Sequence, residues 1–319
     1  MKAKLISPFW VMVRKEMADH MRSWRYNLML LLIGLTCLGS LYTAMMSIRE
    51  AVPKDQTLNA FLFLKLFTVS DGTLPPFITF IGFLGPLLGI SLGFDAVNSE
   101  RNKGTLSRVM AQPIHRDFLI GAKFVGALIL ISMMFLSLGF LVMGLGLLAI
   151  GIPPSAEEFL RMLLFLLLSI IYVGFWLSLA ILFSIKFRQS ATSALSSLSI
   201  WLFFSVFFTM LIQLIANATA PVNATNPNDI LQHQQFIQVI MSLSPSQLFS
   251  EATTTLLTPT VRSLGPLTLE QVYGAIPSPL PLGQSMLLIW PQVTGMIAAT
   301  LVCFGISYAY FMRQEIRSR

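Results

Sequence analysis

Residues 95–123 read DAVNSERNKGTLSRVMAQPIHRDFLIGAK, a charged stretch that separates two long apolar runs. The middle of this stretch has the spacing of a short amphipathic helix, because Leu106, Val109 and Met110 fall at positions i, i+3 and i+4. A short helix at a membrane surface has a shape that can dock into a groove of another protein. The alternative interpretation is a solvated loop that only connects two membrane-spanning helices.

Turn signals frame this predicted helix on both sides. Gly104 comes just before it, and Thr105 has a side chain suited to the N-cap position. Pro113 ends it, because the residue before a proline is disfavoured in the α conformation. The sequence therefore predicts a short helix between turns.

The composition is that of a membrane protein. Of the 319 residues, 55% are hydrophobic and 11% are charged, and the mean hydropathy is +0.74, whereas soluble domains carry about 25% charged residues. A helix that crosses a membrane needs ~20 apolar residues. Six runs meet this requirement, at 27–47, 75–97, 124–150, 162–185, 191–216 and 286–312. We therefore predict an all-α polytopic membrane protein with six transmembrane helices, folded as one unit over residues 1–319.

The basic residues predict the orientation of the chain. Sixteen of the 21 lysines and arginines lie in residues 1–26, 98–123 and 186–190 and in the tail after Met312. The other five are Arg49, Lys54, Lys65, Arg161 and Arg262. Because cytoplasmic segments are enriched in lysine and arginine, both termini and residues 98–123 are predicted to be cytoplasmic. The net charge of +7 then reflects topology and anionic lipid, and gives no reason to expect a nucleic-acid partner.

Residues 3–26 precede the first run and form a predicted amphipathic helix. Its apolar side chains recur every three or four residues, at Leu5, Ile6, Phe9, Trp10, Val13, Met17, Met21 and Trp24. A basic amphipathic helix of this kind lies in the membrane interface instead of crossing it. It can serve as a plain anchor, as a contact for a cytoplasmic partner, or as both.

A glycine ladder marks the second run. Gly85, Gly89 and Gly93 are four residues apart, which places them on one helix face and lets another helix approach closely. Packing within the chain is slightly favoured over contact with a second subunit.

Two segments are predicted on the external side. Residues 217–285 form the large one, with an amphipathic helix within Ile230–Leu243 and a second helix that begins at a capping box from Ser244 to Gln247 and runs to about Leu257. The apolar segment Leu58–Val69 is expected to lie on the outer surface.

The predicted spans contain almost no ionisable side chains. Asp95, near the end of the second run, is the only acidic candidate in them. Ion-driven transporters keep buried ionisable groups in their spans. The chain also lacks a G-x-x-x-x-G-K-[ST] phosphate loop, and its three scattered histidines suggest no metal site. If this chain moves anything against a gradient, we therefore expect the force to enter from outside the bilayer.

Two motifs resemble those of a known family, the type-2 ATP-binding-cassette (ABC) permeases of bacterial exporters. One is E-x-x-x-G-T-L at residues 100–106, followed by Pro113, Arg116 and the pair Gly121 and Lys123; it is similar to the cytoplasmic loop of these permeases. It departs from the family pattern by having Val109 and Met110 at the aliphatic position and an extra residue between Gly121 and Lys123. The other is similar to the K-E-x-x-D-x-x-R segment before the first helix, and comprises Arg14, Lys15, Glu16, Asp19, Arg22 and Arg25.

The resemblance implies a non-catalytic membrane subunit without a cofactor of its own. Two copies of a separate subunit would bind ATP and Mg²⁺, and two permease chains, as a homodimer, would form the pathway in the bacterial inner membrane. The residues that the resemblance assigns to partner coupling are Glu100, Arg101, Gly104, Thr105, Leu106, Val109, Met110, Pro113 and Arg116. Glu100 and Arg101 would contact the partner through charge, and the apolar residues would fill its groove.

Two other functions stay open. Some members of this family pass mechanical force to an extracytoplasmic protein, including one that serves copper-site maturation, and the large external segment is compatible with such a periplasmic partner. A membrane-embedded enzyme is a remote alternative, because its best acidic pair, Glu157 and Glu158, is better explained as charge at a helix N-terminus.

Overall fold

The computed structural model describes residues 7–51, 61–105, 116–151, 153–219, 227–259 and 279–313, and all regular elements in these ranges are helices. Six helical segments are long and apolar enough to cross a membrane: Trp24–Ile48, Phe77–Asn102, Arg116–Ile150, Ala156–Lys186, Ser190–Thr219 and Leu282–Arg313. The prediction of an all-helical chain with six candidate spans is confirmed for the part of the chain that the structure describes.

The described part of the chain contains thirteen helical elements in sequence order. Their bounds are α1 Pro8–Met21, α2 Trp24–Ala51, α3 Leu62–Thr68, α4 Phe77–Gly93, α5 Asn98–Asn102, α7 Arg116–Ile150, α8 Ala156–Lys186, α9 Ser190–Leu202, η2 Phe203–Phe207, α10 Phe208–Thr219, α11 Pro227–Met241, α12 Pro245–Leu257 and α14 Leu282–Arg313.

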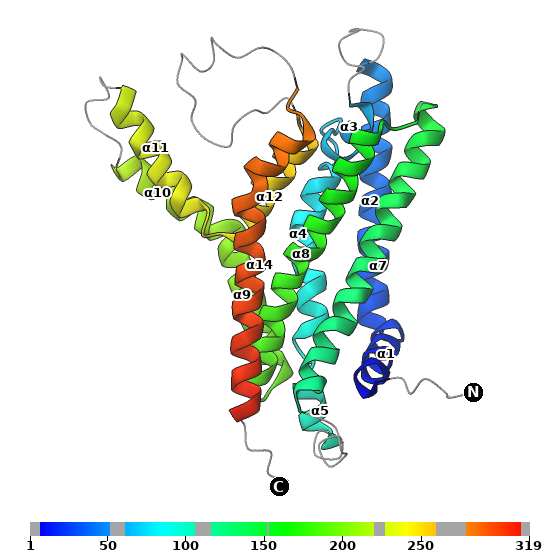
Figure 1. The fold of residues 1–319 in the computed structure, drawn as a ribbon, viewed down its shortest axis with the longest axis vertical. Helices are drawn as coiled ribbons and strands as arrows, with labels where there is room; N and C mark the ends of the chain where they lie inside the picture. Colours follow the sequence, from blue (N-terminus) through cyan, green and yellow to red (C-terminus); the bar gives the residue numbers. More distant parts are fainter. Residues whose placement is uncertain are drawn as a thin grey trace.

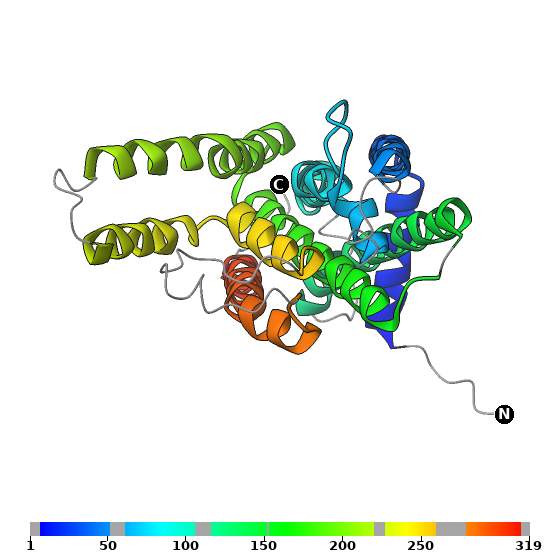
Figure 2. The ribbon, with the colours of Figure 1, turned by 90° about the horizontal axis from the view of Figure 1, so that it is seen from above.

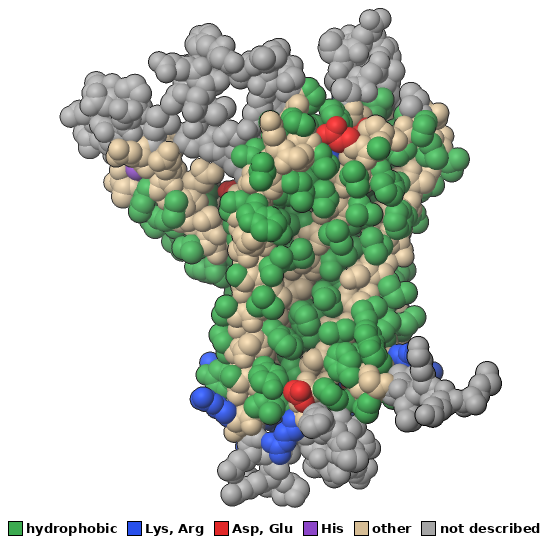
Figure 3. Space-filling view, viewed as in Figure 1, with side chains coloured by type: hydrophobic (Ala, Val, Ile, Leu, Met, Phe, Trp, Pro, Cys, Tyr) green, Lys and Arg blue, Asp and Glu red, His purple; other side chains and the backbone are tan. Residues whose placement is uncertain are grey.

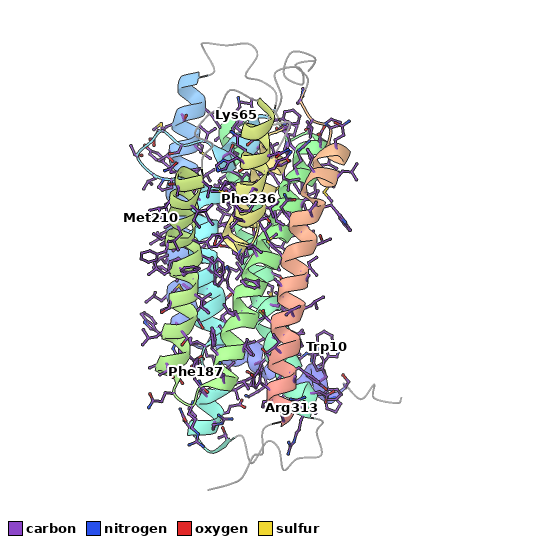
Figure 4. All side chains as sticks on the ribbon, turned by 90° about the vertical axis from the view of Figure 1, so that its left-hand side faces the viewer. Trp10, Lys65, Phe187, Met210, Phe236 and Arg313 are labelled. Carbon is purple, nitrogen blue, oxygen red and sulfur yellow. The ribbon has the colours of Figure 1, made fainter. Side chains whose placement is uncertain are left out.

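The long helices run side by side, and one end of the bundle carries α5 and both ends of the described chain (Figure 1). We call this the terminal end and the opposite one the far end. Trp10, Phe187 and Arg313 lie toward the terminal end and Lys65 toward the far end (Figure 4). On the face shown in Figure 3, lysine and arginine side chains gather at the terminal end, below a wide hydrophobic band.

Helix α8 is the central helix of the bundle, and it packs most extensively against α4 and α14. The predicted glycine ladder of α4 lies along it. A Cβ atom built on Gly89 would lie 2.7 Å from the carbonyl oxygen of Val173, and one built on Gly93 would lie 2.8 Å from the Cβ of Ala180. At Gly85 the nearest atom would be a methyl carbon of Val173, at 2.8 Å. Because these three positions of α4 carry no side chain, the backbones of α4 and α8 can approach each other closely.

The fifth span leaves the bundle part of the way along its length. It was predicted as one helix over 191–216, but the structure interrupts it with the π-helical segment η2 between α9 and α10. Beyond η2, α10 diverges from the other helices, and α11 returns beside it, so that the two form an arm (Figures 1 and 2). Thr219 and His233 join the two helices of the arm by a hydrogen bond of 3.0 Å.

Two spanning helices begin at least six residues earlier than predicted. Helix α7 begins at Arg116 instead of near residue 124, and α8 begins at Ala156 instead of near residue 162. Both therefore include buried charged residues, namely Lys123, Glu158 and Arg161. The prediction that the spans hold almost no ionisable groups is wrong for this reason: apolar runs mark the lipid-facing middle of a helix, whereas the helix itself continues into paired charges at its ends.

Helix α3 does not lie on the outer surface as predicted. Its side chains Phe63, Leu64, Leu66 and Phe67 are all buried. Phe67 packs edge-on against Phe77 of α4 and Phe165 of α8, with ring centroids 5.1 and 5.7 Å apart. The apolar character of this segment reflects its insertion among the far ends of the long helices.

The two helices predicted within residues 217–285 are both present. Ser244 caps α12 by accepting a hydrogen bond from the backbone N–H of Gln247 at 3.4 Å. The reciprocal half of the predicted capping box is replaced, because the Gln247 side chain donates to Glu251 at 3.1 Å. Helix α12 is more buried than its predicted place in an external segment suggests, since it packs against α8 and α14.

The close contact at Gly89 predicts a clear cost for a single methyl group. Gly89→Ala is expected to lower the free energy of unfolding by about 1–3 kcal/mol, because its Cβ would collide with the rigid backbone of α8. Gly34→Ala is the matched control, since Gly34 is also helical but has no atom within 4 Å of the added Cβ. Thermal unfolding in detergent measures the difference. Equal transitions for the two variants would contradict this account of α4 and α8.

Candidate functional site

Helix α1 lies across the terminal end of the bundle, roughly perpendicular to the long helices, and is bound to α7 (Figures 1 and 2). Its buried residues Val13 and Glu16 face a groove left by Gly126 on α7, where a Cβ would lie 3.2 Å from that of Glu16. Gly121 similarly lies below the ring of Phe9. Part of the predicted apolar stripe thus packs on the protein, whereas Trp10 and Met21 remain exposed.

A buried lysine lies at the centre of the site. The side chain of Lys123, on α7, is only 4% exposed, and its Nζ lies 3.2 Å from Oε2 of Glu16 and 2.8 Å from Oε1 of Glu100. These carboxylates come from α1 and α5. One ammonium group therefore joins three segments that are far apart in the sequence. We call Glu16, Glu100 and Lys123, together with Lys15, the terminal cluster.

Lys15 closes the terminal cluster on its solvent side. Its Nζ lies 2.9 Å from Glu16, 3.6 Å from Glu100 and 3.1 Å from Asp19. Burial alone would lower the pKa of Lys15, but the neighbouring carboxylates, Glu16 first, outweigh this and raise it. Because Lys15 and Asp19 are more than half exposed, solvent screens their pair, and most of the stabilisation comes from Lys123.

Helix α5 is fixed to α8 as well as to the terminal cluster. The backbone N–H groups of Val97 and Asn98 donate to the hydroxyl oxygen of Ser184 at 2.9 and 3.2 Å. These two groups belong to the N-terminal end of α5, where a helix lacks internal acceptors. The terminal-end half of α8 thus holds the start of the charged stretch in place.

Gly104 ends α5 instead of merely preceding the next helix. Its φ is +67°, a left-handed conformation that glycine adopts at helix C-termini, and its N–H donates to the carbonyl oxygen of Arg101 at 3.1 Å. Thr105 donates its hydroxyl to the carbonyl oxygen of Glu100 at 3.2 Å. The N-cap role predicted for Thr105 concerns the helix after it, which lies outside the described residues.

A second ion pair lies beside the terminal cluster. Arg25, at the start of α2, pairs with Asp95 just beyond α4, and its guanidinium carbon is 5.0 Å from the centroid of the Phe94 ring. The only acidic residue that the sequence analysis placed in a span is thus tied to the basic segment before the first helix.

The structure brings some of the predicted site residues together and leaves others apart. Glu16 and Glu100 meet at Lys123, and Lys15 links both of them to Asp19. Three other predicted residues are exposed, namely Arg14, Arg22 and Arg116. Leu106, Val109, Met110 and Pro113 lie outside the described residues, so their predicted partner-coupling role stays a prediction.

From the sequence, Lys123 is only the end of a motif, and its central place in the terminal cluster was not predicted. Its sequence context does contain a signal for burial. Lys123 borders an apolar run and has glycines two residues before it and three residues after it.

Comparison with known proteins adds an independent finding. A family model described as "ABC-2 family transporter protein" matches residues 10–316. A protein of Stutzerimonas stutzeri, described as "Probable ABC transporter permease protein NosY", is 24% identical over 235 residues, which cover 69% of this chain and 78% of that protein.

Removing the buried ammonium is expected to release α1. Lys123→Met leaves Glu16 and Glu100 facing each other without a buried cation, a change that typically costs about 3–5 kcal/mol. Amide hydrogen exchange should accelerate throughout Pro8–Met21. The control Asp19→Asn affects an exposed pair and should cost less than about 1 kcal/mol. Unchanged exchange in α1 of Lys123→Met would contradict the role of the terminal cluster.

Mild acid is expected to weaken the docking of α1 through His20. Burial lowers the pKa of His20 below its usual 6.5, although Glu16 opposes this, so the folded chain disfavours the imidazolium. Stability should then fall as the pH drops below 6.5, where the undocked imidazole takes up its proton. The pKa of Glu16 is also lowered, because Lys123 and Lys15 outweigh its burial, and its contribution is lost only below 4.5.

The measurement compares Tm for the wild type and His20→Gln across this pH range. The wild type should lose stability relative to the variant below pH 6.5. A difference in Tm that does not change with pH would show that His20 does not titrate against the folded state.

Proposed function

The chain belongs to the ABC-2 family of transporter proteins, and we propose that it is the membrane permease subunit of an ATP-driven exporter. Permeases of this family work with an ATP-binding subunit, so ATP and Mg²⁺ would be bound by that partner and not by this chain. The proposal includes a homodimer of permeases with two ATP-binding subunits, placed in the bacterial inner membrane with the terminal end in the cytoplasm. The excess of lysine and arginine in the segments of the terminal end supports this orientation.

The terminal cluster is the observation that carries this proposal. Lys123 binds Glu16 and Glu100 at once, so the interfacial helix α1, the start of the charged stretch and the spanning helix α7 are joined at one buried point. Ser184 adds α8 to this unit. A force applied to residues 98–116 would therefore act on several spans together instead of bending a loop.

The mechanism follows from this connection. The partner would grip the segment that contains Leu106, Val109 and Met110, and the closure of two ATP-binding subunits would displace it. Because α5 continues from α4 and the segment leads directly into α7, both spanning helices would tilt. Helix α1 would move with them, since its Glu16 is bound to Lys123.

The ion pairs of Glu100 favour a positioning role for it. The family resemblance implies a contact between its charge and the partner, and in the structure its Oε1 lies 2.8 Å from Nζ of Lys123. We infer that Glu100 positions the partner-binding segment from the side of the bundle, through its ion pair with Lys123 of α7. Its side chain is 12% exposed, which leaves little of it for a partner to reach.

Force transmission to another protein at the far end is the second candidate function. The arm of α10 and α11 supports it, because the arm stands away from the bundle (Figure 1) and exposes Phe236 and Val239. A periplasmic protein that copurifies through this arm, with no substrate that stimulates ATP hydrolysis, would favour this function over export.

The test uses the complex of the full chain with the ATP-binding subunit that copurifies with it from native membranes. Gly104→Val forces a β-branched residue into the left-handed region and should lower ATP hydrolysis of the complex roughly tenfold, while membrane insertion is unchanged. Gly151→Val is the matched control, because Gly151 also has a positive φ (77°) and free space around it but lies at the far end of α7.

Two results would overturn the proposal. One is an equal ATPase activity for Gly104→Val and the wild type, since the partner would then not act through this segment. The other is the absence of any ATP-binding subunit in material purified from native membranes.

A further inference from the structure

A second buried cluster organises the far end of the bundle. The side chain of Arg161, in the second turn of α8, is fully buried. Its Nε and one terminal nitrogen donate to Oε1 of Glu157 at 3.1 and 2.9 Å. Its hydrogen bonds outside α8 go to segments of the chain that lie about a hundred residues further on.

These contacts bind three separate pieces of the far end. Arg161 donates to the carbonyl oxygen of Leu256 at 2.8 Å, in the last turn of α12, where a helix has unpaired carbonyls. It also donates to the carbonyl oxygen of Leu280 at 2.6 Å and to the hydroxyl of Ser285 in the first turn of α14 at 3.1 Å. Leu280 in turn donates its N–H to the carbonyl oxygen of Pro259 at 2.8 Å. This hydrogen bond joins the residues that directly follow α12 to those that directly precede α14.

Helix α3 is held by the same turns of α8. Glu158 completes the capping box with Ser155, and its Oε1 accepts the N–H of Phe63 at 3.1 Å. The ring of Phe61 lies 5.9 Å from the guanidinium carbon of Arg161, and its backbone has the unfavourable φ of 61°. A strained residue directly before α3, held against a buried cation, indicates that the surroundings fix this geometry.

Arginine suits this position better than lysine. The guanidinium offers five N–H donors in one plane, and three nitrogens here reach four acceptors in different directions. An ammonium group has three donors at a single point and cannot span them. The rest of α8 connects this cluster to the terminal end, since α8 packs backbone to backbone on α4 and α4 leads into α5.

We propose that Arg161 is a positioning residue that carries movement of α8 to α12 and to the start of α14, so that the far end responds when the partner acts on the terminal end. This inference rests on the proposed function, because it needs a force that enters through α5. Coupling between distant sites requires a direct measurement of both sites, so the test monitors the two ends separately.

The experiment measures amide hydrogen exchange in the complex with the copurified ATP-binding subunit, with and without ATP. In the wild type, ATP should change exchange at the terminal end, in α1 and α5, and at the far end, in α12 and the first turn of α14. In Arg161→Gln, the terminal-end change and the ATPase activity should persist, whereas the far-end change should fall roughly tenfold, because the helices lose a charged hydrogen-bonding partner. A merely structural role would alter exchange equally with and without ATP.

Ser169→Ala is the control. Ser169 is also buried on α8, but its hydroxyl donates to the carbonyl oxygen of Phe165 in the same helix, so the far-end response should stay within about twofold of the wild type. Should Arg161→Gln fail to assemble, Arg161→Lys decides, because it keeps the charge but not the geometry, and its far-end response should fall clearly below that of Ser169→Ala.

The possible outcomes separate the two proposals. A far-end response of wild-type size in Arg161→Gln, or in Arg161→Lys where only this variant assembles, overturns the role of Arg161 and leaves the proposed function intact. A wild-type complex in which ATP changes neither end overturns the proposed function itself.

Discussion

A charge inside a membrane bundle must be neutralised by a partner at contact distance, and the architecture of this chain follows from that requirement. Lys123 would be prohibitively costly alone in an apolar groove. Glu16 and Glu100 therefore have to reach it from α1 and α5, and both segments are held against α7 as a result. At the opposite end, Glu157 neutralises the buried guanidinium of Arg161 within α8, and the remaining N–H donors of Arg161 bind acceptors on α12 and α14. Two buried charges thus fix the relative positions of segments that hydrophobic burial alone would not determine in lipid.

Helix α8 connects these two gathered ends. Its close approach to α4 depends on glycines that leave no side chain between the backbones, and such contacts replace the hydrophobic driving force that is weak between helices in lipid. Ser184 near one end of α8 binds α5, and Arg161 near its other end binds α12 and α14. A rigid central helix with specific attachments at each end is a reasonable physical basis for long-range coupling in a permease.

The sequence predicted the six spans, the helix that begins after Ser244 and the interfacial segment, because hydropathy and capping are local properties. It also singled out the two motifs that contain Glu16 and Glu100, which meet at the terminal end. It did not reveal that Glu100 turns toward Lys123, nor that α3 is inserted among the long helices, because both depend on contacts between segments 23 to 107 residues apart. Arg161 was assigned to an outer segment for the same reason: a charge at the edge of an apolar run is exposed or buried according to partners that no local pattern describes.

The π-helical segment η2 changes which face of the fifth span is turned toward the bundle. A π-turn accommodates one residue more than an α-turn, which rotates all following side chains by about 100° around the helix axis. The face that α9 turns toward the bundle is consequently not continuous with the inward face of α10. The carbonyl oxygen of Phe204, within this segment, lies 3.5 Å from the hydroxyl of Ser244, which donates to it. A one-residue deletion between Phe203 and Phe207 would restore a regular helix. The arm would then be rotated about the axis of α9 and would leave the bundle in a different direction.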